Sequence, residues 1–318
     1  MTDATRIGSV LLGAGHYQPE RVMTNDDLTA FVETSDEWIR QRTGIVTRHI
    51  AADDESVVDL AEHAARDALA GLDLAAVAID LVVVASCTSD QRSPNVAGRV
   101  AQRLGLNGPA IIDVNVACSG FVHALAVADQ AIRAGSATTA LVIGAEKLSA
   151  MTDWSDRTTC VLTADAAGAF VIQRSEQPTL SDVTWGSVPE LADAVRIEPP
   201  TNKFAQEGKA VFKWGISEAE KLARATLEKA GHSVSDIGLF VSHQANLRII
   251  EPLARQLGLT DAVIATDVTA SGNTSAASIP LAWSKLHRSG GLPKGVPALL
   301  FGFGGGFAYA GMVLRTPE

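Results

Sequence analysis

The sequence has few features of membrane, secreted or nucleic-acid-binding proteins. None of the 318 residues lies in an apolar run of about 18, so we expect no transmembrane helix and no membrane partner. The segment from Met1 to Arg6 lacks the basic and apolar regions of a signal peptide. The net charge of −10 argues against general binding to nucleic acid. We therefore expect a protein that works away from membranes and nucleic acids.

Cysteine is scarce as well, since the chain contains only Cys87, Cys118 and Cys160. Three scattered thiols cannot form a disulfide framework, and no Cys-x-x-Cys pair is present to hold a metal ion. We expect no metal site. A reducing cytoplasm is the location that this cysteine content favours.

The composition and the residue patterns of the chain indicate a well-packed α/β protein. Apolar residues make up 47% and charged residues 19% of the chain, which is typical of a globular protein with a large core. Helical and strand patterns alternate, which predicts sheets covered by helices on both faces. The predicted helices are 35–43, 54–71, 94–104, 119–134, 216–230, 246–257 and 275–289. The predicted strands are 7–13, 79–86, 110–114, 139–144, 167–173, 237–242, 262–265, 297–303 and 307–314.

Two strand-like segments recur at nearly one spacing. Residues 80–86 resemble 237–243, an offset of 237 − 80 = 157, and residues 140–144 resemble 298–302, an offset of 298 − 140 = 158. An internal duplication of an α/β unit accounts for both matches. Chance likeness between common strand patterns is the alternative.

The duplication predicts two halves, residues 1–175 and residues 176–318. No linker rich in proline, glycine or serine separates them. The stretch 174–208 is polar and contains four prolines, which indicates an irregular connection with a surface or active-site loop. A capping-box pattern from Thr34 to Glu37 predicts the start of the first helix.

Cys118 lies between an apolar run and a long alanine-rich helical pattern. A strand–turn–helix placement would bring its thiol to a helix N-terminus, which favours negative charge and would lower the thiol pKa. Position 118 plus the offset of 157 gives Ser275 as the counterpart of Cys118, two residues after Asn273. The alternative is a buried, inert cysteine, because free cysteine is often a core residue.

His243 and Asn273 are the other candidate catalytic residues. His243 follows an apolar strand-like run, and strand ends in α/β sheets are where ligands bind. Asn273 precedes a predicted helix, although Gly-Asn-Thr-Ser is also ordinary turn and cap sequence. A structural histidine is the alternative for His243. Together a Cys, a His and an Asn at strand ends suit acyl transfer through a thioester.

These segments resemble β-ketoacyl-acyl-carrier-protein synthase III. The resemblance rests on Ala-Cys-Ser-Gly-Phe around Cys118, His-Gln-Ala-Asn-Leu-Arg-Ile-Ile from His243, and Gly-Asn-Thr-Ser-Ala-Ala-Ser-Ile-Pro around Asn273. Shorter matches are 34–39, 42–45, 156–160, 211–213 and 302–307. The family implies a thiolase-like fold with two duplicated α/β halves in an α-β-α-β-α layered arrangement, and a homodimer.

The resemblance also implies the chemistry. Cys118 would accept the acyl group of a short acyl-CoA primer, and malonyl-acyl-carrier protein would then lose carbon dioxide and attack the acyl-enzyme. His243 Nε2 and the Asn273 amide would stabilise the oxyanion of decarboxylation, and the backbone N–H groups of Cys118 and Gly306 the oxyanion of condensation. The products would be a 3-ketoacyl-carrier protein, carbon dioxide and CoA. The family needs no metal or tightly bound cofactor, since the coenzyme A thioester is a substrate.

The resemblance assigns further residues to the two substrates. The residues that would contact CoA are Trp38 and Arg157 around the adenine, Arg42 and Thr34 at the nucleotide end, and Asn246 and Phe212 along the pantetheine arm. The acyl carrier protein would meet a basic patch formed by Lys213, Arg248 and Arg255.

The chain departs from the family where the primer would bind. The segment Gln91-Arg92-Ser93 is polar where the family often has a large apolar residue, and Thr163 and Ala166 replace a Phe and a Gly. We assign Gln91 and Arg92 to the primer pocket. We hypothesise that Arg92 helps to accept a polar or carboxylated acyl group.

Three other functions remain as alternatives. A related synthase of a secondary pathway would prime a polyketide or transfer an acyl group without decarboxylation. A non-catalytic acyl-CoA-binding protein would form no covalent adduct on Cys118. A nicotinamide-dependent enzyme has only Gly13 and Gly15 in its favour, and the third glycine of the dinucleotide motif is missing.

Overall fold

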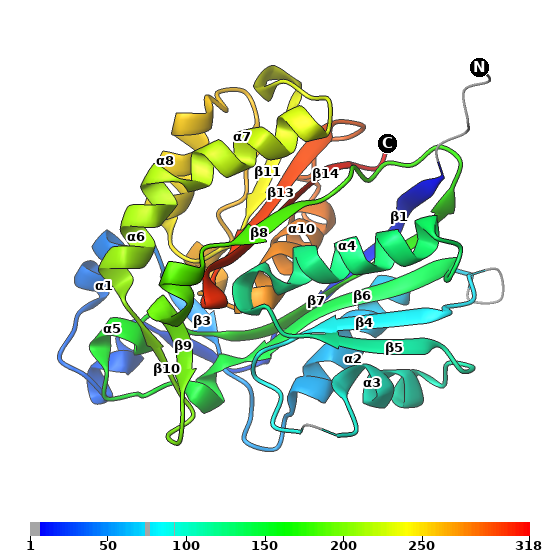
Figure 1. Ribbon diagram of the computed structural model, residues 1–318. Coiled ribbons are helices and arrows are strands. Elements are labelled where there is room, and N and C mark those ends of the chain that lie inside the picture. Colours follow the sequence, from blue (N-terminus) through cyan, green and yellow to red (C-terminus); the bar gives the residue numbers. More distant parts are fainter. Residues whose placement is uncertain (1–6, 74–76, 92) are drawn as a thin grey trace.

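The computed structural model describes residues 7–73, 77–91 and 93–318. Two five-stranded sheets form its framework (Figure 1). The first has the order β1-β7-β6-β4-β5 and consists of β1 (Gly8–Tyr17), β4 (Leu81–Ala85), β5 (Ala110–Val114), β6 (Thr139–Lys147) and β7 (Asp165–Ser175). The second has the order β12-β11-β13-β14-β8 and consists of β8 (Thr184–Ser187), β11 (Leu239–Ser242), β12 (Val263–Ile264), β13 (Pro297–Phe303) and β14 (Ala308–Arg315).

The two sheets have the same strand order and the same internal register. Leu81 of β4 pairs with Ala140 of β6, and Leu239 of β11 pairs with Ala298 of β13. Each residue of the second pair therefore lies 158 positions after its counterpart in the first pair (239 − 81 and 298 − 140). Ala117 and Ser275, which both have a positive φ, are separated by 275 − 117 = 158 as well. This register makes Ala276 the counterpart of Cys118, so the prediction that Ser275 takes that place is wrong by one residue.

The helices and sheets stack in five layers, α-β-α-β-α, as predicted (Figure 1). The central layer consists of α4 (Gly120–Arg133) and α10 (Ser278–Arg288). The outer face of the first sheet carries α2 (Val57–Leu69) and α3 (Val96–Leu104). The outer face of the second carries α6 (Gly208–Ser217), α7 (Ala219–Lys229) and α8 (Leu247–Leu257).

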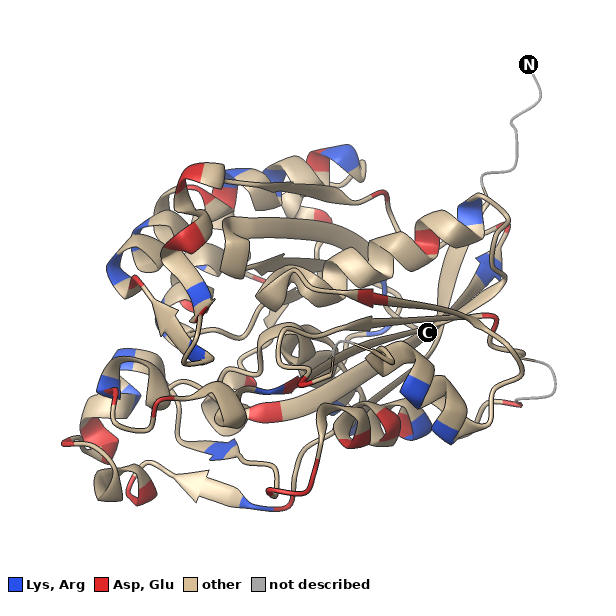
Figure 2. Cartoon of the chain, turned by 60° about the horizontal axis from the view of Figure 1, so that its bottom comes forward, with Lys and Arg blue, Asp and Glu red and all other residues tan. Residues whose placement is uncertain are grey.

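Buried apolar strands and close helix contacts hold the layers together. All five residues of β4 are buried, as a continuous apolar run predicts for a strand covered on both faces. A Cβ atom at Gly144 would lie 2.4 Å from the carbonyl oxygen of Ala276, and one at Gly168 would lie 2.6 Å from Leu281 N. Only glycine therefore lets the first sheet approach α10 this closely. Figure 2 shows that the strands are mostly uncharged and that the charges gather on helices and loops.

Each of the predicted helices and strands has a counterpart in the structure, but the sequence missed several short elements. The stretch 174–208, predicted to be irregular, contains β8 and a hairpin of β9 (Val195–Glu198) and β10 (Lys203–Gln206). The helix α6 was also missed, as was the hairpin of β2 (Val22–Thr24) and β3 (Thr47–His49). The remaining helical elements are α5 (Arg157–Cys160), α9 (Val268–Ser271), η1 (Asp27–Ala30), η2 (Ala117–Ser119), η3 (Leu148–Met151), η4 (Pro189–Ala194), η5 (Val234–Asp236), η6 (Ser275–Ala277) and η7 (Gly305–Phe307).

The first α-helix, α1 (Asp36–Thr43), begins differently from the prediction. Ser35, and not Thr34, is its N-cap, because the Ser35 side chain accepts a hydrogen bond from Trp38 N at 3.1 Å. The Oγ1 atom of Thr34 is buried without a hydrogen-bond partner. Gly44 ends the helix in the left-handed conformation, so that α1 stops at Thr43, the predicted last residue.

The described residues contain no candidate for a membrane-spanning helix or for a metal site. No described helix combines the length and the apolar character needed to cross a membrane. No group of three or more His, Cys, Asp and Glu side chains within the described ranges is arranged to hold a metal ion.

Candidate active site

Cys118 lies in η2, on the turn that leads from β5 into α4. The turn is strained, because Ala117 has a φ of 43°. Gly304, directly after β13, packs against it: a Cβ atom at Gly304 would lie 2.5 Å from the Cβ and 2.8 Å from the Sγ of Cys118. Gly304 therefore gives the thiol its space, and the two halves of the chain meet at the sulfur atom.

The thiol opens into a cavity of about 830 Å³. Segments from both sheets line it, among them Cys87, Thr88, Ser89, Asp90, Asn115, Cys118, Met151, Arg196, Asn202, Phe204, Asn273, Ser275, Gly305 and Gly306. The structure thus brings together three of the predicted site residues, Cys118, Asn273 and Gly306. A cavity of this size lies in the range of small-molecule binding sites.

His243 is buried at the end of β11 and does not line this cavity directly. Its backbone N–H donates to the carbonyl oxygen of Phe301, and its ring packs edge-on against Phe303 at a centroid distance of 6.2 Å. Gly304 follows β13 directly and contacts Cys118. The end of β13 therefore lies next to both the imidazole and the thiol.

Ser278 lies beside one nitrogen of the His243 ring. Its Oγ lies 2.8 Å from His243 Nδ1 and 3.3 Å from the backbone N–H of Gln244, which can only donate. A Ser278 hydroxyl that donates to Nδ1 leaves the imidazole proton on Nε2. Burial lowers the pKa of His243 to about 3, so the ring is neutral at physiological pH.

The carboxamide of Asn273 is oriented by its own loop. Its Oδ1 accepts a hydrogen bond of 2.9 Å from Ser275 N. Its backbone pairs with the neighbouring segment, since Asn273 N donates to Leu162 O and Ala164 N donates to Asn273 O. With the oxygen occupied, the side-chain NH2 group is the part of Asn273 that can donate to a ligand.

The pKa of Cys118 differs from the prediction. Burial raises it to about 11, although the backbone N–H of Gly305 donates to the sulfur and favours the thiolate. The rise from 9.0 corresponds to about 3 kcal/mol, whereas a helix N-terminus contributes roughly 0.3–1 kcal/mol. Burial therefore outweighs the helix dipole, and the predicted low pKa of Cys118 is wrong.

Glu146 is a buried carboxylate next to Cys118 that the sequence analysis missed. It is completely buried at the end of β6. Its oxygens accept from Thr88 Oγ1 at 2.6 Å and from Ser275 Oγ at 3.0 Å. A charged residue at the end of an otherwise apolar strand was the available signal, because such a position is buried and needs partners.

The residues that the resemblance assigns to CoA lie at the ends of α1, α5, α6 and α8. The guanidinium carbon of Arg157 lies 4.8 Å from the ring centroid of Trp38, and that of Arg42 lies 5.8 Å away. Arg157 and Trp38 are thus already in contact, so an adenine can enter between them only if Arg157 moves. The Nδ2 of Asn246 donates to Arg42 O, and Phe212 is half-buried beneath Arg248.

The other predicted contact residues vary in their placement. Lys213, Arg248 and Arg255 are exposed on the adjacent helices α6 and α8. Gln91 is exposed and does not line the cavity of the single chain, whereas the neighbouring Asp90 does. Arg92 lies outside the described residues.

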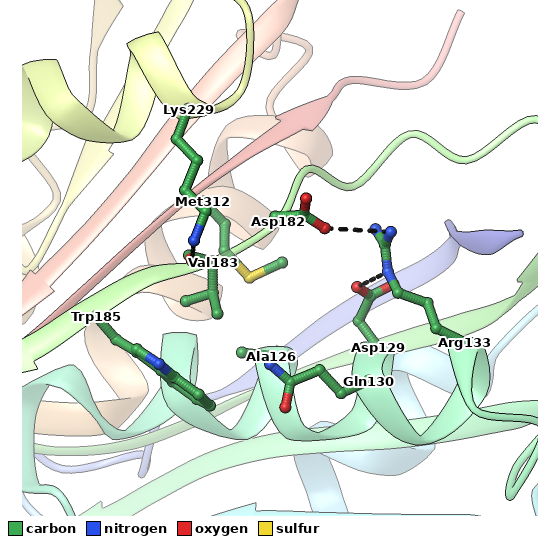
Figure 3. A pocket seen from close by; sticks show the side chains of 9 residues that line it. All are labelled: Ala126, Asp129, Gln130, Arg133, Asp182, Val183, Trp185, Lys229 and Met312. Atoms are coloured by element: carbon green, nitrogen blue, oxygen red, sulfur yellow. Dashed lines mark hydrogen bonds and ion pairs between the residues drawn. The ribbon is translucent and has the colours of Figure 1, made fainter. Parts of the chain in front are cut away.

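A second cavity, of about 230 Å³, lies apart from Cys118 (Figure 3). Figure 3 shows Arg133 between Asp129 and Asp182, with which it forms ion pairs. Ala126, the lining residue nearest to Cys118 in sequence, is eight positions further along α4, or about 12 Å of helix. This cavity therefore belongs to the seam between α4 and the second sheet, and not to the site around the thiol.

Comparison with known proteins decides the family. The family described as 3-oxoacyl-[acyl-carrier-protein (ACP)] synthase III matches residues 112–189, and its C-terminal part matches residues 227–316. A Streptomyces avermitilis protein named beta-ketoacyl-[acyl-carrier-protein] synthase III 2 is 57% identical over 313 residues, which cover 98% of this chain and 99% of that protein. The chain belongs to the β-ketoacyl-[acyl-carrier-protein] synthase III family. The predicted family is thus confirmed.

Other members of the synthase III family are similar over the same length. One from Rhodospirillum centenum is 46% identical, with 96% of this chain and 98% of that protein covered. The crystal structure of 3-oxoacyl-(acyl carrier protein) synthase III from Pseudomonas aeruginosa has a TM-score of 0.92 at 39% identity, covering 98% and 99% of the two chains. The priming β-ketosynthase of the R1128 polyketide pathway has a TM-score of 0.93 at 37% identity, covering 98% and 96%. These neighbours confirm the thiolase-like fold.

Proposed function

We propose that the protein condenses a short acyl-CoA with malonyl-acyl-carrier protein and so starts fatty-acid synthesis. The observation that carries this proposal is the shared cavity of Cys118 and Asn273, with His243 fixed behind it as a neutral donor. A pure acyl transfer needs the thiol but not a second pair of hydrogen-bond donors. Release of carbon dioxide from malonyl-carrier protein, together with an acyl adduct on Cys118, tests the proposal. An adduct without carbon dioxide release contradicts it.

The first half-reaction takes place at the sulfur atom. Cys118 attacks the thioester carbonyl, CoA leaves, and the acyl group remains on the enzyme, which divides one difficult condensation into two easier steps. Backbone N–H groups of Cys118 and Gly306 are suited to the carbonyl oxygen, because both residues border the cavity. The positive φ of Gly306, 67°, gives this turn a conformation that favours glycine.

The second half-reaction uses His243 and Asn273. Decarboxylation of the malonyl group pushes an electron pair onto its thioester oxygen, and donors fixed in advance stabilise that charge. The Nε2–H of His243 and the NH2 group of Asn273 are the two donors. Because the pKa of His243 is about 3, the ring donates as a neutral group from about pH 5 to pH 9.

The primer remains the open part of the function. Polar residues, among them Thr88, Asp90 and Arg196, line part of the cavity beside apolar ones such as Met151. The priming ketosynthase of a polyketide pathway is a close structural neighbour. Both observations favour a secondary-pathway synthase as the second candidate. Loading of Cys118 from acetyl-, isobutyryl- and glutaryl-CoA distinguishes them, since a clear preference for the branched apolar primer excludes a carboxylated one.

Trp38 and Arg157 provide a stacking platform for the CoA adenine. We expect Trp38→Ala to raise KM for acyl-CoA about tenfold with little change in kcat, because base–aromatic stacking contributes about 1–3 kcal/mol. Steady-state kinetics with both substrates measures this. Phe31→Ala is the matched control, since Phe31 is an exposed aromatic residue that stacks on Trp154 instead. An equal rise in KM for malonyl-carrier protein would contradict the assignment.

The carrier protein is expected to dock on α6 and α8. Lys213, Arg248 and Arg255 form a basic patch there on an otherwise acidic protein. An acidic partner would meet this patch faster at low salt than at high salt.

We also propose a homodimer that pairs through β5. Within the described residues this edge strand is bonded to β4 alone, and it exposes Ile111 and Ile112 by 45% and 37%. An exposed apolar edge is a template for pairing with a second strand. The helix α4, which contacts β5, carries His123, and the His123 ring stacks on Trp185 of β8.

Ile112→Lys is expected to convert the dimer to a monomer, because the added charges would face each other across the paired edges. Sedimentation velocity measures the change. The matched control is Val263→Lys on β12, an edge strand of the second sheet with the same exposure of 37%. If the protein with Ile112→Lys remains a dimer, the interface lies elsewhere.

The need for a reduced Cys118 supports a cytoplasmic location, since thiols persist in a reducing compartment. The three cysteines, Cys87, Cys118 and Cys160, are all free.

A further inference from the structure

A completely buried arginine lies behind the loop that carries Asn273. Arg48 is on β3, and its Nη1 and Nη2 donate to Asn25 Oδ1 and to the carbonyl oxygen of Val161, both at 2.9 Å. Its Nε is buried without a hydrogen-bond partner. No ion pair of the described residues includes this guanidinium. Burying a cation without a counter-ion costs free energy, which points to a role other than packing.

The carbonyl group that Arg48 holds belongs to the segment that fixes the backbone of Asn273. Val161 directly precedes Leu162, whose carbonyl oxygen accepts from Asn273 N at 2.8 Å. Ala164 N in turn donates to Asn273 O at 2.9 Å, and the pairing is an isolated parallel β-bridge. The guanidinium therefore acts one residue away from an atom that sets the position of Asn273.

The backbone around Arg48 holds the other side of the same loop. The N–H of residue 46 and the hydroxyl of residue 47 donate to the carbonyl oxygens of Thr269 and Ala270, at 2.7 and 2.8 Å. A Cβ atom at Gly272 would lie 3.1 Å from the Cβ of Arg48, so the residue before Asn273 packs directly on this arginine. The segment around Arg48 thus joins both parts of the chain between which the Asn273 backbone is held.

We propose that Arg48 is a positioning residue for Asn273, which fixes the segment 161–164 so that the NH2 group of Asn273 meets the oxyanion of decarboxylation. The inference rests on the proposed role of Asn273 in that step. A donor stabilises a developing charge best when its position is set before the reaction, and a displacement of about 1 Å can lower a rate about 100-fold. Arg48 itself is completely buried and does not line the cavity, so it acts only through Asn273.

A guanidinium suits this task better than a shorter or neutral side chain. Its planar fork presents donors in fixed directions, which a lysine does not. Burial lowers the pKa of Arg48 to about 10, so the group stays charged at neutral pH, and a charged donor forms the stronger hydrogen bond. Val161 is also the C-cap of α5, where carbonyl oxygens lack partners within the helix.

Asn25 anchors the other side of the fork. It is buried, and its Nδ2 donates to the carbonyl oxygen of Ile45 and to Asp36 Oδ1, both at 2.8 Å. Because its NH2 group is occupied in this way, its Oδ1 faces Arg48 as an acceptor. The guanidinium is therefore fixed from one side and can fix Val161 from the other.

The test compares acyl loading, measured by mass spectrometry, with release of labelled carbon dioxide from malonyl-carrier protein. For Arg48→Gln we expect loading from acetyl-CoA to stay within about threefold, and decarboxylation to be about 30- to 100-fold slower. Arg48→Lys keeps the charge but not the fork, so we expect decarboxylation to be only about tenfold slower. KM for malonyl-carrier protein should change less than about threefold in both variants.

A double variant shows whether Arg48 acts through Asn273. If it does, Arg48→Gln has little left to disturb once the amide is gone. Added to Asn273→Ala, it should slow decarboxylation by less than about a further threefold, so that the two effects are not additive.

Arg133→Gln is the matched control. Arg133 also holds a backbone carbonyl group, since its Nη2 donates to Leu180 O at 3.0 Å, but it lies on α4 beside the second cavity. We expect this change to lower the melting temperature and to leave the ratio of loading to decarboxylation unchanged. Thermal unfolding of each variant separates a loss of stability from a change in that ratio.

Equal slowing of loading and decarboxylation in Arg48→Gln would overturn the inference, since that is the result of a merely structural arginine. Unchanged decarboxylation, or fully additive effects in the double variant, would overturn it as well. If Arg48→Gln does not fold, Arg48→Lys decides by the same comparison, and failure of both to fold counts against a positioning role. Absence of carbon dioxide release by the unchanged protein would instead contradict the proposed function.

Discussion

Replacing Cys118 by serine is expected to abolish acyl transfer from CoA to the protein, a loss of at least about 1,000-fold. The hydroxyl of serine is a much weaker nucleophile than a thiolate at neutral pH, and its smaller oxygen does not reach as far into the cavity. Mass spectrometry after incubation with acetyl-CoA measures the covalent adduct directly.

The matched control for this change is Cys160→Ser. Cys160 is a buried free cysteine in α5, outside the cavity. Its replacement should leave acyl loading within about threefold, apart from any loss of stability through a buried hydroxyl. An adduct of equal yield in Cys118→Ser would mean that another residue carries the acyl group. No adduct in the unchanged protein would favour an acyl-CoA-binding protein without catalysis.

Asn273→Ala is expected to spare acyl loading and to slow decarboxylation about 100- to 1,000-fold. Removal of one donor to a developing oxyanion costs on the order of 3 kcal/mol. In the proposed mechanism the loading step does not use this donor, because its oxyanion is assigned to backbone N–H groups. Loading is followed by mass spectrometry, and decarboxylation by release of labelled carbon dioxide from malonyl-carrier protein.

A second variant separates catalysis from folding. Asn273 Oδ1 accepts a hydrogen bond from Ser275 N, so alanine also removes a contact that shapes the turn. Asn273→Asp keeps that acceptor, but it replaces the NH2 donor by an oxygen and adds a negative charge, so it should lose decarboxylation as well. Equal loss of loading and decarboxylation in both variants would contradict the assigned role.

The sequence predicted most of the fold because its central strands are unusual. Continuous apolar runs such as β4 and β13 are recognisable without any knowledge of their partners. The hairpin of β9 and β10 was missed, since its residues are mixed in character and mostly half-buried. Such short strands depend on the elements against which they pack. The helix α6 was missed for a similar reason, because it begins at Gly208 without a side-chain cap.

The sequence also predicted three residues of the candidate site, but not their environment. Gly304 could be seen as part of a glycine-rich turn, yet only its contact with Cys118 explains why a side chain is excluded there. Ser278 was hidden in a helix start, although its hydroxyl lies 2.8 Å from His243 Nδ1. Glu146 lay two residues beyond the predicted strand 139–144. These contacts join residues that are 35 to 186 positions apart.

By itself the sequence determined the residue types and their order: a cysteine, a histidine and an asparagine, each beside an apolar strand, in two halves with matching strand patterns. The tertiary structure alone decided how those groups hold their protons. It buried the thiol and so raised its pKa, kept the imidazole neutral, and surrounded the buried carboxylate of Glu146 with hydroxyl donors. The physical reason is that desolvation and hydrogen bonding depend on every segment that surrounds a group, whereas a local sequence specifies only the segment that carries it.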